Sequence, residues 1–207
     1  MPNCPRSWAA RRLQFEDSVL DYVARTDSIR LVILGSLFSQ YLPSHELLGS
    51  GRGGRRMLER RNGLLEERDA EMTLAFDAMS RTIDSLRRLG KRVIVVAPPP
   101  SSGADIGRCL ERSALGKLVL GAQRECRLSA DDYRRHQGPV LHFLEALRRR
   151  TGVEVIDPAS HLCSDGSCAT RVDGVFVYRD AGHLSYDGSR LLARRMNWAH
   201  LMGLDQP

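Results

Sequence analysis

The sequence predicts an α/β fold in which helices cover both faces of a parallel sheet. Short apolar runs alternate along the chain with longer segments whose apolar residues recur every three or four positions, the pattern of strands and helices in turn. The apolar runs contain few polar residues, as is typical of parallel strands buried on both faces. The chain has 207 residues, of which 42% are hydrophobic and 27% charged, which suits one globular domain. We therefore expect residues 1–207 to form a single domain.

The first predicted helix spans Ser7–Arg25 and the first predicted strand spans 29–34. Ser7 is a residue type that caps helices, and the helix has an apolar face formed by Phe15, Val19, Tyr22 and Val23. The strand is apolar except for Arg30 and ends at Gly35-Ser36. Residues 42–69 lack such a pattern, and their Gly- and Arg-rich part predicts a mobile, solvated loop without chemistry.

A helix over 70–89 and a strand over 93–97 are predicted next. The helix has a continuous apolar stripe, formed by Met72, Phe76, Met79, Ile83 and Leu86. Gly90 follows it and favours the left-handed conformation in which many helices end. The strand stops at Pro98–Pro100, because proline has no N–H to donate to a sheet.

The second half of the chain continues this alternation. Residues 101–128 predict an irregular excursion, after which Ser129 caps a helix to about Arg150 that Gly138-Pro139 bends or divides. The inner face of this helix is predicted to hold Val140, Leu144 and Leu147.

Two short strands and a last helix complete the prediction. The strands span 153–156 and 174–178. The helix begins at Ser185 or Asp187 and runs to about Met202, burying Leu192, Met196 and Ala199.

The loops after three of the strands are expected to converge, because parallel sheets place their sites beyond the carboxyl ends of the strands. They are residues 35–37, 98–102 and 178–185, and the last of them contains Asp180 and His183. A carboxylate can fix one ring nitrogen of a histidine while the other nitrogen takes a proton from a nucleophile. The spacing leaves a structural alternative open, in which Asp180 only accepts backbone N–H groups in a turn and His183 is a surface residue.

The five cysteines indicate an oxidising compartment. Cys163 and Cys168 bracket a short turn, and Cys109 and Cys126 would close a longer loop, so we expect two disulfides. Cys4 has no obvious partner. The alternatives are free thiols in a cytosolic protein, or a zinc site that uses His161 with Cys163 and Cys168. The latter lacks the usual two-residue cysteine spacing, so we expect no metal.

Charge and hydropathy exclude several classes of protein. The net charge is +6 and the isoelectric point near 9.4, but the arginines are scattered and aromatic residues make up 6%, so we expect no nucleic-acid partner. The sequence contains no run of apolar residues that predicts a transmembrane helix and no apolar core of a signal peptide.

Four blocks of the sequence resemble a known family. They are VILGSLFSQYL at 32–42, VIVVAPPP at 93–100, VIDPASHLCSDGSCATRVDG at 155–174 and YRDAGHLSYDGSRLLARRM at 178–196. Together they resemble the SGNH (GDSL-type) hydrolase domain of membrane-bound type 3 acyltransferases, which include O-antigen and exopolysaccharide O-acetyltransferases. The resemblance implies a three-layer α/β/α sandwich, flavodoxin-like, at the periplasmic face of the inner membrane. It also implies that Asp180 orients His183, that His183 is the general base, and that no cofactor takes part.

The sequence departs from this family at the nucleophile. The family uses a serine from a Gly-Asp-Ser block on its first strand, and these residues contain no such block. We therefore expect the chain to start after that strand. Gly35 matches an oxyanion-donor position of the second block, whereas Pro98–Pro100 offer neither an Asn nor a backbone N–H. Ser36 is an alternative nucleophile, although its block does not carry the nucleophile in the family.

The resemblance predicts serine-type acyl transfer or ester hydrolysis, most specifically O-acetylation of a cell-envelope glycan such as lipopolysaccharide or exopolysaccharide. The implied partners are a membrane acyltransferase domain and the glycan acceptor. An alternative is a truncated or degenerate module that binds glycan or a membrane partner without turnover. The cysteines disfavour a simple cytosolic esterase.

Overall fold

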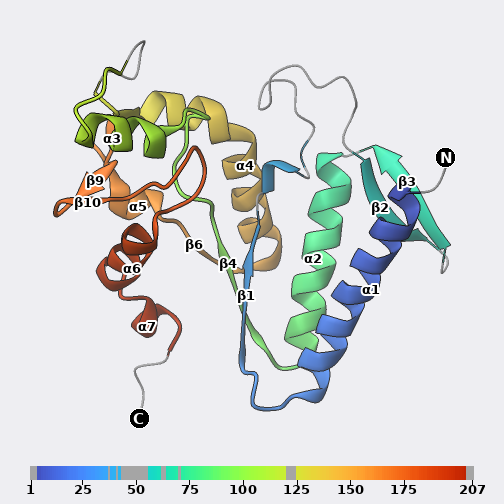
Figure 1. Cartoon of the computed structure of the whole chain (residues 1–207). Coiled ribbons are helices and arrows are strands. Elements are labelled where there is room, and N and C mark those ends of the chain that lie inside the picture. The colour runs from blue at the N-terminus through green and yellow to red at the C-terminus, as the bar shows by residue number, and fades with distance from the viewer. Residues whose placement is uncertain are drawn as a thin grey trace. The chain divides into compact units, whose positions relative to one another are not determined.

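Three strands, β1, β4 and β6, form one sheet of the structure (Figure 1). The computed structural model describes residues 4–36, 38–40, 42, 56–61, 64–69, 71–119 and 125–203. The sheet has the order β1-β4-β6, formed by Leu31–Gly35, Arg92–Val96 and Glu154–Ile156. Along the chain, helix α2 (Met72–Arg88) lies between β1 and β4, and helix α4 (Ala130–Thr151) lies between β4 and β6, as in the crossovers of a parallel sheet. The predicted α/β fold class with a parallel sheet is confirmed.

The chain divides into two compact units, and the division passes through all three strands of this sheet. The first unit comprises Met1–Leu34, Phe38–Val95 and Glu145–Glu154. The second comprises Gly35–Leu37, Val96–Leu144 and Val155–Pro207. The loops that follow the carboxyl ends of the strands therefore all belong to the second unit. The prediction of a single domain over 1–207 stays a prediction.

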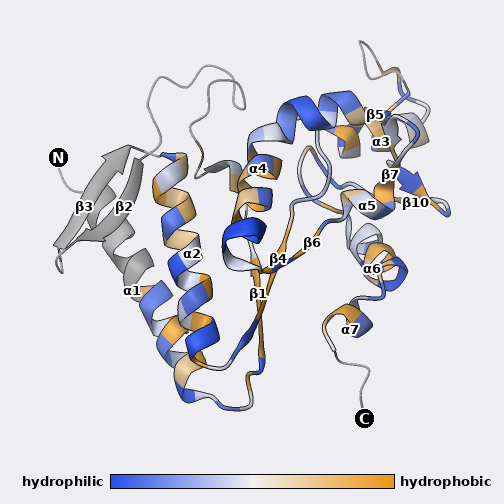
Figure 2. Cartoon of the chain, turned by 180° about the vertical axis from the view of Figure 1, so that it is seen from behind, coloured by the Kyte–Doolittle hydropathy of each residue, from blue (hydrophilic) through white to orange (hydrophobic). Residues whose placement is uncertain are grey.

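The core of the first unit is built on β4. Val93, Ile94 and Val95 are buried, and so are Ile83 and Leu86 of α2. Figure 2 shows the corresponding hydrophobic colouring along the strands. Continuous apolar sequence therefore predicted burial correctly for β4, which has a neighbouring strand on each side.

Two predictions of burial in the first unit were wrong. Strand β1 is at the edge of the described sheet, and Ile33 is 42% exposed. Helix α1 (Cys4–Arg25) begins three residues before the predicted cap Ser7, and only Val23 of its predicted apolar face is buried. Phe15 is 68% and Tyr22 62% exposed. Periodicity identifies an apolar face, but it does not identify what covers that face.

The predicted loop in the Gly- and Arg-rich part of residues 42–69 was also wrong where the structure describes it, beyond residue 55. Arg56–Arg61 (β2) and Leu64–Asp69 (β3) pair as an antiparallel hairpin. A signal for it exists in the sequence, because Asn-Gly stands at 62–63 and this dipeptide favours two-residue hairpin turns. Residues 43–55 lie outside the described residues. Before them in the chain, Phe38–Gln40 form a short 3-10 helix, η1.

The second unit contains a helix where an irregular excursion was predicted. Helix α3 spans Ile106–Ala114, and the side chain of Asp105 caps it by accepting the N–H of Arg108 at 2.9 Å. Helix α4 begins after Ser129, whose Oγ accepts the N–H groups of Asp131 and Asp132 as predicted. Pro139 lies within α4 without dividing it.

Two small antiparallel sheets account for the segment between β6 and the last helices. One sheet is formed by β5 (Leu128–Ser129), β8 (Ser167–Cys168) and β7 (Cys163–Ser164). The short helix α5 (Ala159–Leu162) directly precedes β7 in the chain. Strands β9 (Arg171–Val172) and β10 (Val175–Phe176) form the other, so the predicted fourth strand over 174–178 is not in the parallel sheet. Asp173 and Gly174 both have positive φ, as a tight hairpin turn requires.

Two helices occupy the region where one last helix to about Met202 was predicted. Ser185 caps α6 (Tyr186–Arg195), and α7 (Trp198–Leu201) follows. Asn197 separates them with a φ of +48°, and Asn tolerates this left-handed conformation better than most residues. Leu192 and Met196 are buried as predicted, whereas Ala199 is exposed.

Candidate active site

The loop that contains Asp180 and His183 is closed by the backbone on both sides. Tyr178 and Leu184 form an isolated antiparallel bridge, and the Arg179 N–H donates to the His183 carbonyl at 2.9 Å. Ser185 follows directly, and its Oγ accepts the N–H of Gly188 at 2.8 Å as the N-cap of α6. The loop is therefore held between a bridge and a capped helix, a local arrangement that restricts where its side chains point.

Asp180 and His183 are hydrogen-bonded to each other. His183 Nδ1 lies 2.9 Å from Asp180 Oδ1 and 3.0 Å from Oδ2. Oδ1 also accepts the N–H groups of Gly182 at 3.0 Å and His183 at 2.9 Å. The bond from Gly182 is the main reason that the pKa of Asp180 lies well below its usual range, and the bonds from His183 and Arg179 lower this pKa further.

The low pKa of Asp180 determines how the pair is protonated. An ionised carboxylate only accepts hydrogen bonds, so the proton of a neutral His183 ring must be on Nδ1. Nε2 then carries a lone pair, and the side chain of His183 is 71% exposed. This is the arrangement of a general base that a carboxylate orients.

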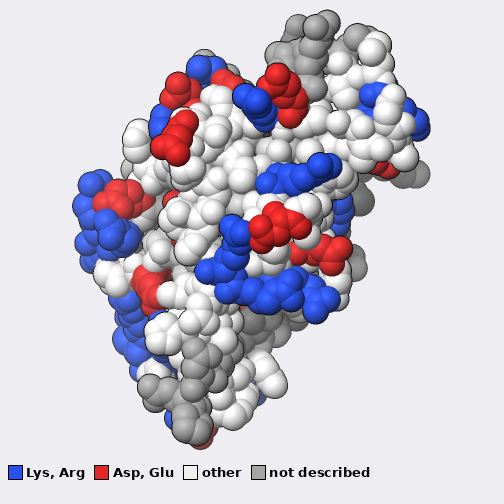
Figure 3. Space-filling view, turned by 90° about the vertical axis from the view of Figure 1, so that its left-hand side faces the viewer, with Lys and Arg blue, Asp and Glu red and all other residues white. Residues whose placement is uncertain are grey.

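Arg179 is a third charged residue of this group, and sequence reasoning missed it. Its Nε and Nη2 both donate to Asp180 Oδ2 at 3.2 Å. Both oxygens of the carboxylate are therefore occupied by donors. Similar pairs occur elsewhere in the second unit, as between Arg195 and Asp173 at 2.8 Å, and Figure 3 shows basic and acidic side chains interspersed over one face of the molecule.

Two of the three loops predicted to converge are in contact. Ser101 Oγ donates to the carbonyl of Ala181 at 2.7 Å and accepts the N–H of Gly103 at 3.1 Å. Ser101 is buried, so this bond joins the loop after β4 to the loop of Asp180 and His183 away from solvent. Gly35 and Ser36 belong to the same unit, and the convergence of their loop with the loop of His183 stays a prediction. Leu37 lies outside the described residues.

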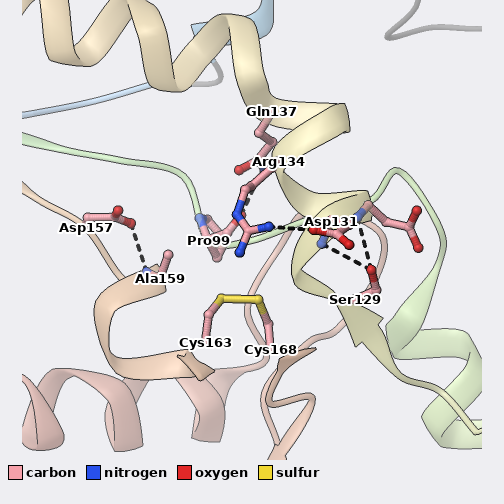
Figure 4. Close-up of a disulfide and its surroundings, with 10 residues drawn as sticks. Pro99, Ser129, Asp131, Arg134, Gln137, Asp157, Ala159, Cys163 and Cys168 are labelled. Carbon is pink, nitrogen blue, oxygen red and sulfur yellow. Dashed lines mark hydrogen bonds and ion pairs between the residues drawn. A yellow bond between two sulfur atoms is a disulfide. The ribbon is translucent and has the colours of Figure 1, made fainter. Parts of the chain in front are cut away.

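A second polar group, which sequence reasoning also missed, follows strand β6. Asp157 Oδ1 accepts the N–H of Ala159 at 2.8 Å, and burial raises the pKa of this carboxyl group (Figure 4). Burial also raises the pKa of Tyr133, and the nearby charge of Asp157 raises it further. The signal in the sequence is the position of Asp157, directly after a strand of the parallel sheet.

Two buried side chains near this group have an unpaired polar atom. Gln137 Nε2 donates to the carbonyl of Pro99 at 3.1 Å, while its Oε1 has no hydrogen-bond partner among the described residues (Figure 4). The hydroxyl of Tyr178 is buried and likewise has no partner in the part of the chain that the structure describes. Burial raises the pKa of Tyr178, with a smaller contribution from Tyr133. Tyr178 thus anchors the start of the Asp180 loop mainly through its ring.

Both predicted disulfides are present. Cys109 is bonded to Cys126, with a Cα–Cα distance of 5.5 Å, and Cys163 to Cys168, with a distance of 3.9 Å. The second bond lies in the β7–β8 hairpin (Figure 4) and excludes the alternative of a zinc site at these two cysteines. The side chain of Cys4 lies outside the described residues. The helices that the structure describes include none that is both long and apolar enough to cross a membrane.

The chain is similar to a known protein family and to solved structures. A family model described as the SGNH domain (fused to AT3 domains) matches residues 1–197. Among solved structures, the periplasmic domain of a lipopolysaccharide acetyltransferase from Salmonella ser. Paratyphi A is similar, with a TM-score of 0.51 and 19% sequence identity. The similarity covers 89% of this chain and 61% of that chain, so this chain spans less than two thirds of its length. At this identity the likeness shows a shared fold. No curated protein matches the chain.

Proposed function

The chain belongs to the family of SGNH domains that are fused to AT3 domains, and on this premise we propose that it takes part in serine-type acyl transfer or ester hydrolysis. The observation that carries the proposal is the hydrogen bond between Asp180 and His183. It keeps the ring proton on Nδ1 and leaves Nε2 as the base. The roles proposed are those of an orienting acid and a general base.

In the proposed reaction, a serine Oγ attacks the carbonyl carbon of an acetyl ester. The Oγ–C bond forms while the serine proton moves to His183 Nε2. The C–O bond to the leaving group then breaks, and Nε2 returns the proton to that group. A hydroxyl of the acceptor next gives its proton to Nε2 and attacks the carbonyl carbon of the acetyl-serine, so that a new C–O bond forms. The C–Oγ bond then breaks, and Nε2 returns the proton to Oγ, which restores the serine and the base. Water in place of the acceptor gives hydrolysis.

The proposal assigns the nucleophile to the serine of a Gly-Asp-Ser block, which these 207 residues do not contain. Ser36 is the candidate within this chain, since it follows β1 directly. Gly35 precedes it, and its N–H is proposed as one donor to the oxyanion. Among the described residues, none apart from the two chain neighbours of Gly35 has an atom within 4 Å of the position that a Cβ at Gly35 would take.

The proposed substrate is a glycan of the cell envelope, and the proposed partner is a membrane acyltransferase domain. The family description supports the partner, because it records fusion to AT3 domains. The similar solved structure is named as the periplasmic domain of a lipopolysaccharide acetyltransferase. Two disulfides fit the oxidising conditions of the periplasm. These observations support O-acetylation on the periplasmic side of the membrane.

The proposal is tested by acetyl transfer in cells and by p-nitrophenyl acetate turnover in solution. In the protein fused to its AT3 domain, His183→Ala should abolish glycan O-acetylation, whereas His161→Ala, which changes an exposed histidine in α5, should leave it unchanged. The 207-residue chain alone should not turn over p-nitrophenyl acetate, because a triad without its nucleophile is inert. Turnover by this chain that vanishes with both His183→Ala and Ser36→Ala would make Ser36 the nucleophile.

The second candidate function is binding without turnover. The sequence favours it in one respect, since it contains no Gly-Asp-Ser block. Normal O-acetylation by the His183→Ala protein would support this candidate, because a binding module does not need a general base.

A further inference from the structure

Helix α3 approaches the Asp180 loop more closely than any side chain would permit. A Cβ added at Gly107 would lie 2.0 Å from the carbonyl carbon and oxygen of Arg179 and 2.4 Å from the backbone nitrogen of Asp180. Real Cβ atoms do not come within 3.0 Å of other heavy atoms, and here the neighbours are backbone atoms that no rotamer change can move. Glycine is therefore required at 107 by close backbone approach.

Helix α3 is itself fixed in place. Asp105 caps its start, and Ile106, Cys109 and Leu110 are buried. The disulfide from Cys109 to Cys126 joins the helix to a segment 17 residues further along the chain. A helix held at its cap, its apolar face and one covalent bond cannot easily move away from the Asp180 loop.

The backbone at Asp180 controls the geometry of the pair with His183. Asp180 Oδ1 accepts two backbone N–H groups of its own loop, from Gly182 and His183, at the same time as it contacts His183 Nδ1. A shift of the Arg179–Asp180 peptide would therefore move the carboxylate relative to the imidazole. Ser101 restrains the loop at Ala181, one residue further on.

We propose that Gly107 is a positioning residue, through which disulfide-anchored α3 sets the place of the Asp180 backbone and thereby the hydrogen bond from His183 Nδ1. The geometric part of this proposal stands without any enzymatic activity. Its consequence for catalysis rests on the proposed function of Asp180 and His183.

The test compares Gly107→Ala with Gly138→Ala. Both glycines lie in helices, but a Cβ at Gly138 would have no atom of the described residues within 4 Å outside its chain neighbours and its own helix backbone, so that variant should keep the wild-type structure and activity. Imidazole ¹⁵N chemical shifts of His183, measured on the 207-residue chain, report the fraction of the ring that carries its proton on Nδ1. Gly107→Ala should lower this fraction. In the protein fused to its AT3 domain it should lower kcat for acetyl transfer by about 100-fold with little change in KM, the effect of a misplacement of about 1 Å.

A second variant covers the case in which Gly107→Ala does not fold. Replacing both Cys109 and Cys126 by serine releases α3 without adding an atom that clashes, and it should lower the Nδ1–H fraction in the same direction. Replacing both Cys163 and Cys168 by serine removes the other disulfide and should leave that fraction unchanged.

The outcomes separate the two proposals. The positioning role would be overturned if His183 kept its wild-type ¹⁵N chemical shifts in a folded Gly107→Ala chain. If Gly107→Ala does not fold, wild-type shifts in the Cys109 and Cys126 double variant would overturn it. Altered shifts without any loss of O-acetylation would retain that role and instead refute the proposed function of His183.

Discussion

On the proposed function, replacing Asp180 by asparagine should prevent His183 from acting as the general base without removing any side-chain volume. In the wild-type loop, Oδ1 accepts the N–H groups of Gly182 and His183, and both carboxylate oxygens lie within 3.0 Å of His183 Nδ1. An asparagine has one accepting oxygen and one donating NH₂ group. If the oxygen keeps the backbone bonds, the NH₂ group faces His183 Nδ1 and the donors of Arg179.

The tautomer of His183 would change as a result. With a donor opposite Nδ1, this nitrogen must accept, so the ring proton moves to Nε2, where the base is needed. Loss of the correct tautomer in a serine-histidine-acid triad lowers kcat by about 10⁴-fold, which corresponds to about 5 kcal/mol of transition-state stabilisation. The asparagine variant should therefore retain its fold and lose nearly all activity.

The assay is the initial rate of the proposed glycan O-acetylation by the chain fused to an AT3 domain, with thermal unfolding as the measure of folding. Asp173→Asn is the matched control, since Asp173 is an exposed acid that pairs with Arg195 outside this loop. The control should retain at least half of the wild-type rate. An Asp180→Asn rate within tenfold of wild type would refute the assigned roles of both residues.

Three further predictions concern stability. Replacing Cys163 and Cys168 together by serine should lower the free energy of unfolding by about 2 kcal/mol in urea titrations, because the loop that they close is short; no change would indicate that the hairpin is ordered without the bond. Asp157→Asn should raise the stability of the protein at pH 7 but not below about pH 4. Burial raises the folded-state pKa of this carboxyl group, so ionisation of Asp157 destabilises the folded protein as the pH rises above the unfolded-state pKa near 3.9. Equal effects on Tm at both pH values would contradict this. Tyr178→Phe should change Tm little or raise it, since the hydroxyl removed is buried and has no hydrogen-bond partner among the described residues. A loss of more than about 2 kcal/mol in the free energy of unfolding would mean that the hydroxyl is hydrogen-bonded.

The candidate site was predicted from sequence as far as its interactions are local. Asp180 and His183 are three residues apart in one turn, and the Ser185 cap and the Cys163–Cys168 bond also join residues that are close in sequence. Short separations leave few alternative partners, so residue types and spacing indicate the contact. The hairpin turn at Asp173-Gly174 is local too and has the residue types of a tight turn, but a strand was predicted to begin at Gly174.

The remaining parts of the site join residues that are distant in sequence. Gly107 contacts Arg179 and Asp180 across more than seventy positions, and Ser101 reaches Ala181 across eighty. A glycine in a helix normally predicts only a loss of helix stability. The reason for this one is visible only when the backbone opposite to it is known.

The sequence by itself determined the class of fold, the cysteine pairs and the proximity of Asp180 to His183. These follow from periodicity, turn chemistry and short-range spacing, which each segment carries in its own residues. Only the tertiary structure decided that β1 is at the edge of the described sheet, that most of the apolar face of α1 is exposed, and that α3 packs against the Asp180 backbone. Burial and close approach depend on what lies on the other side of a residue, and a pattern within one segment contains no information about its neighbours in space.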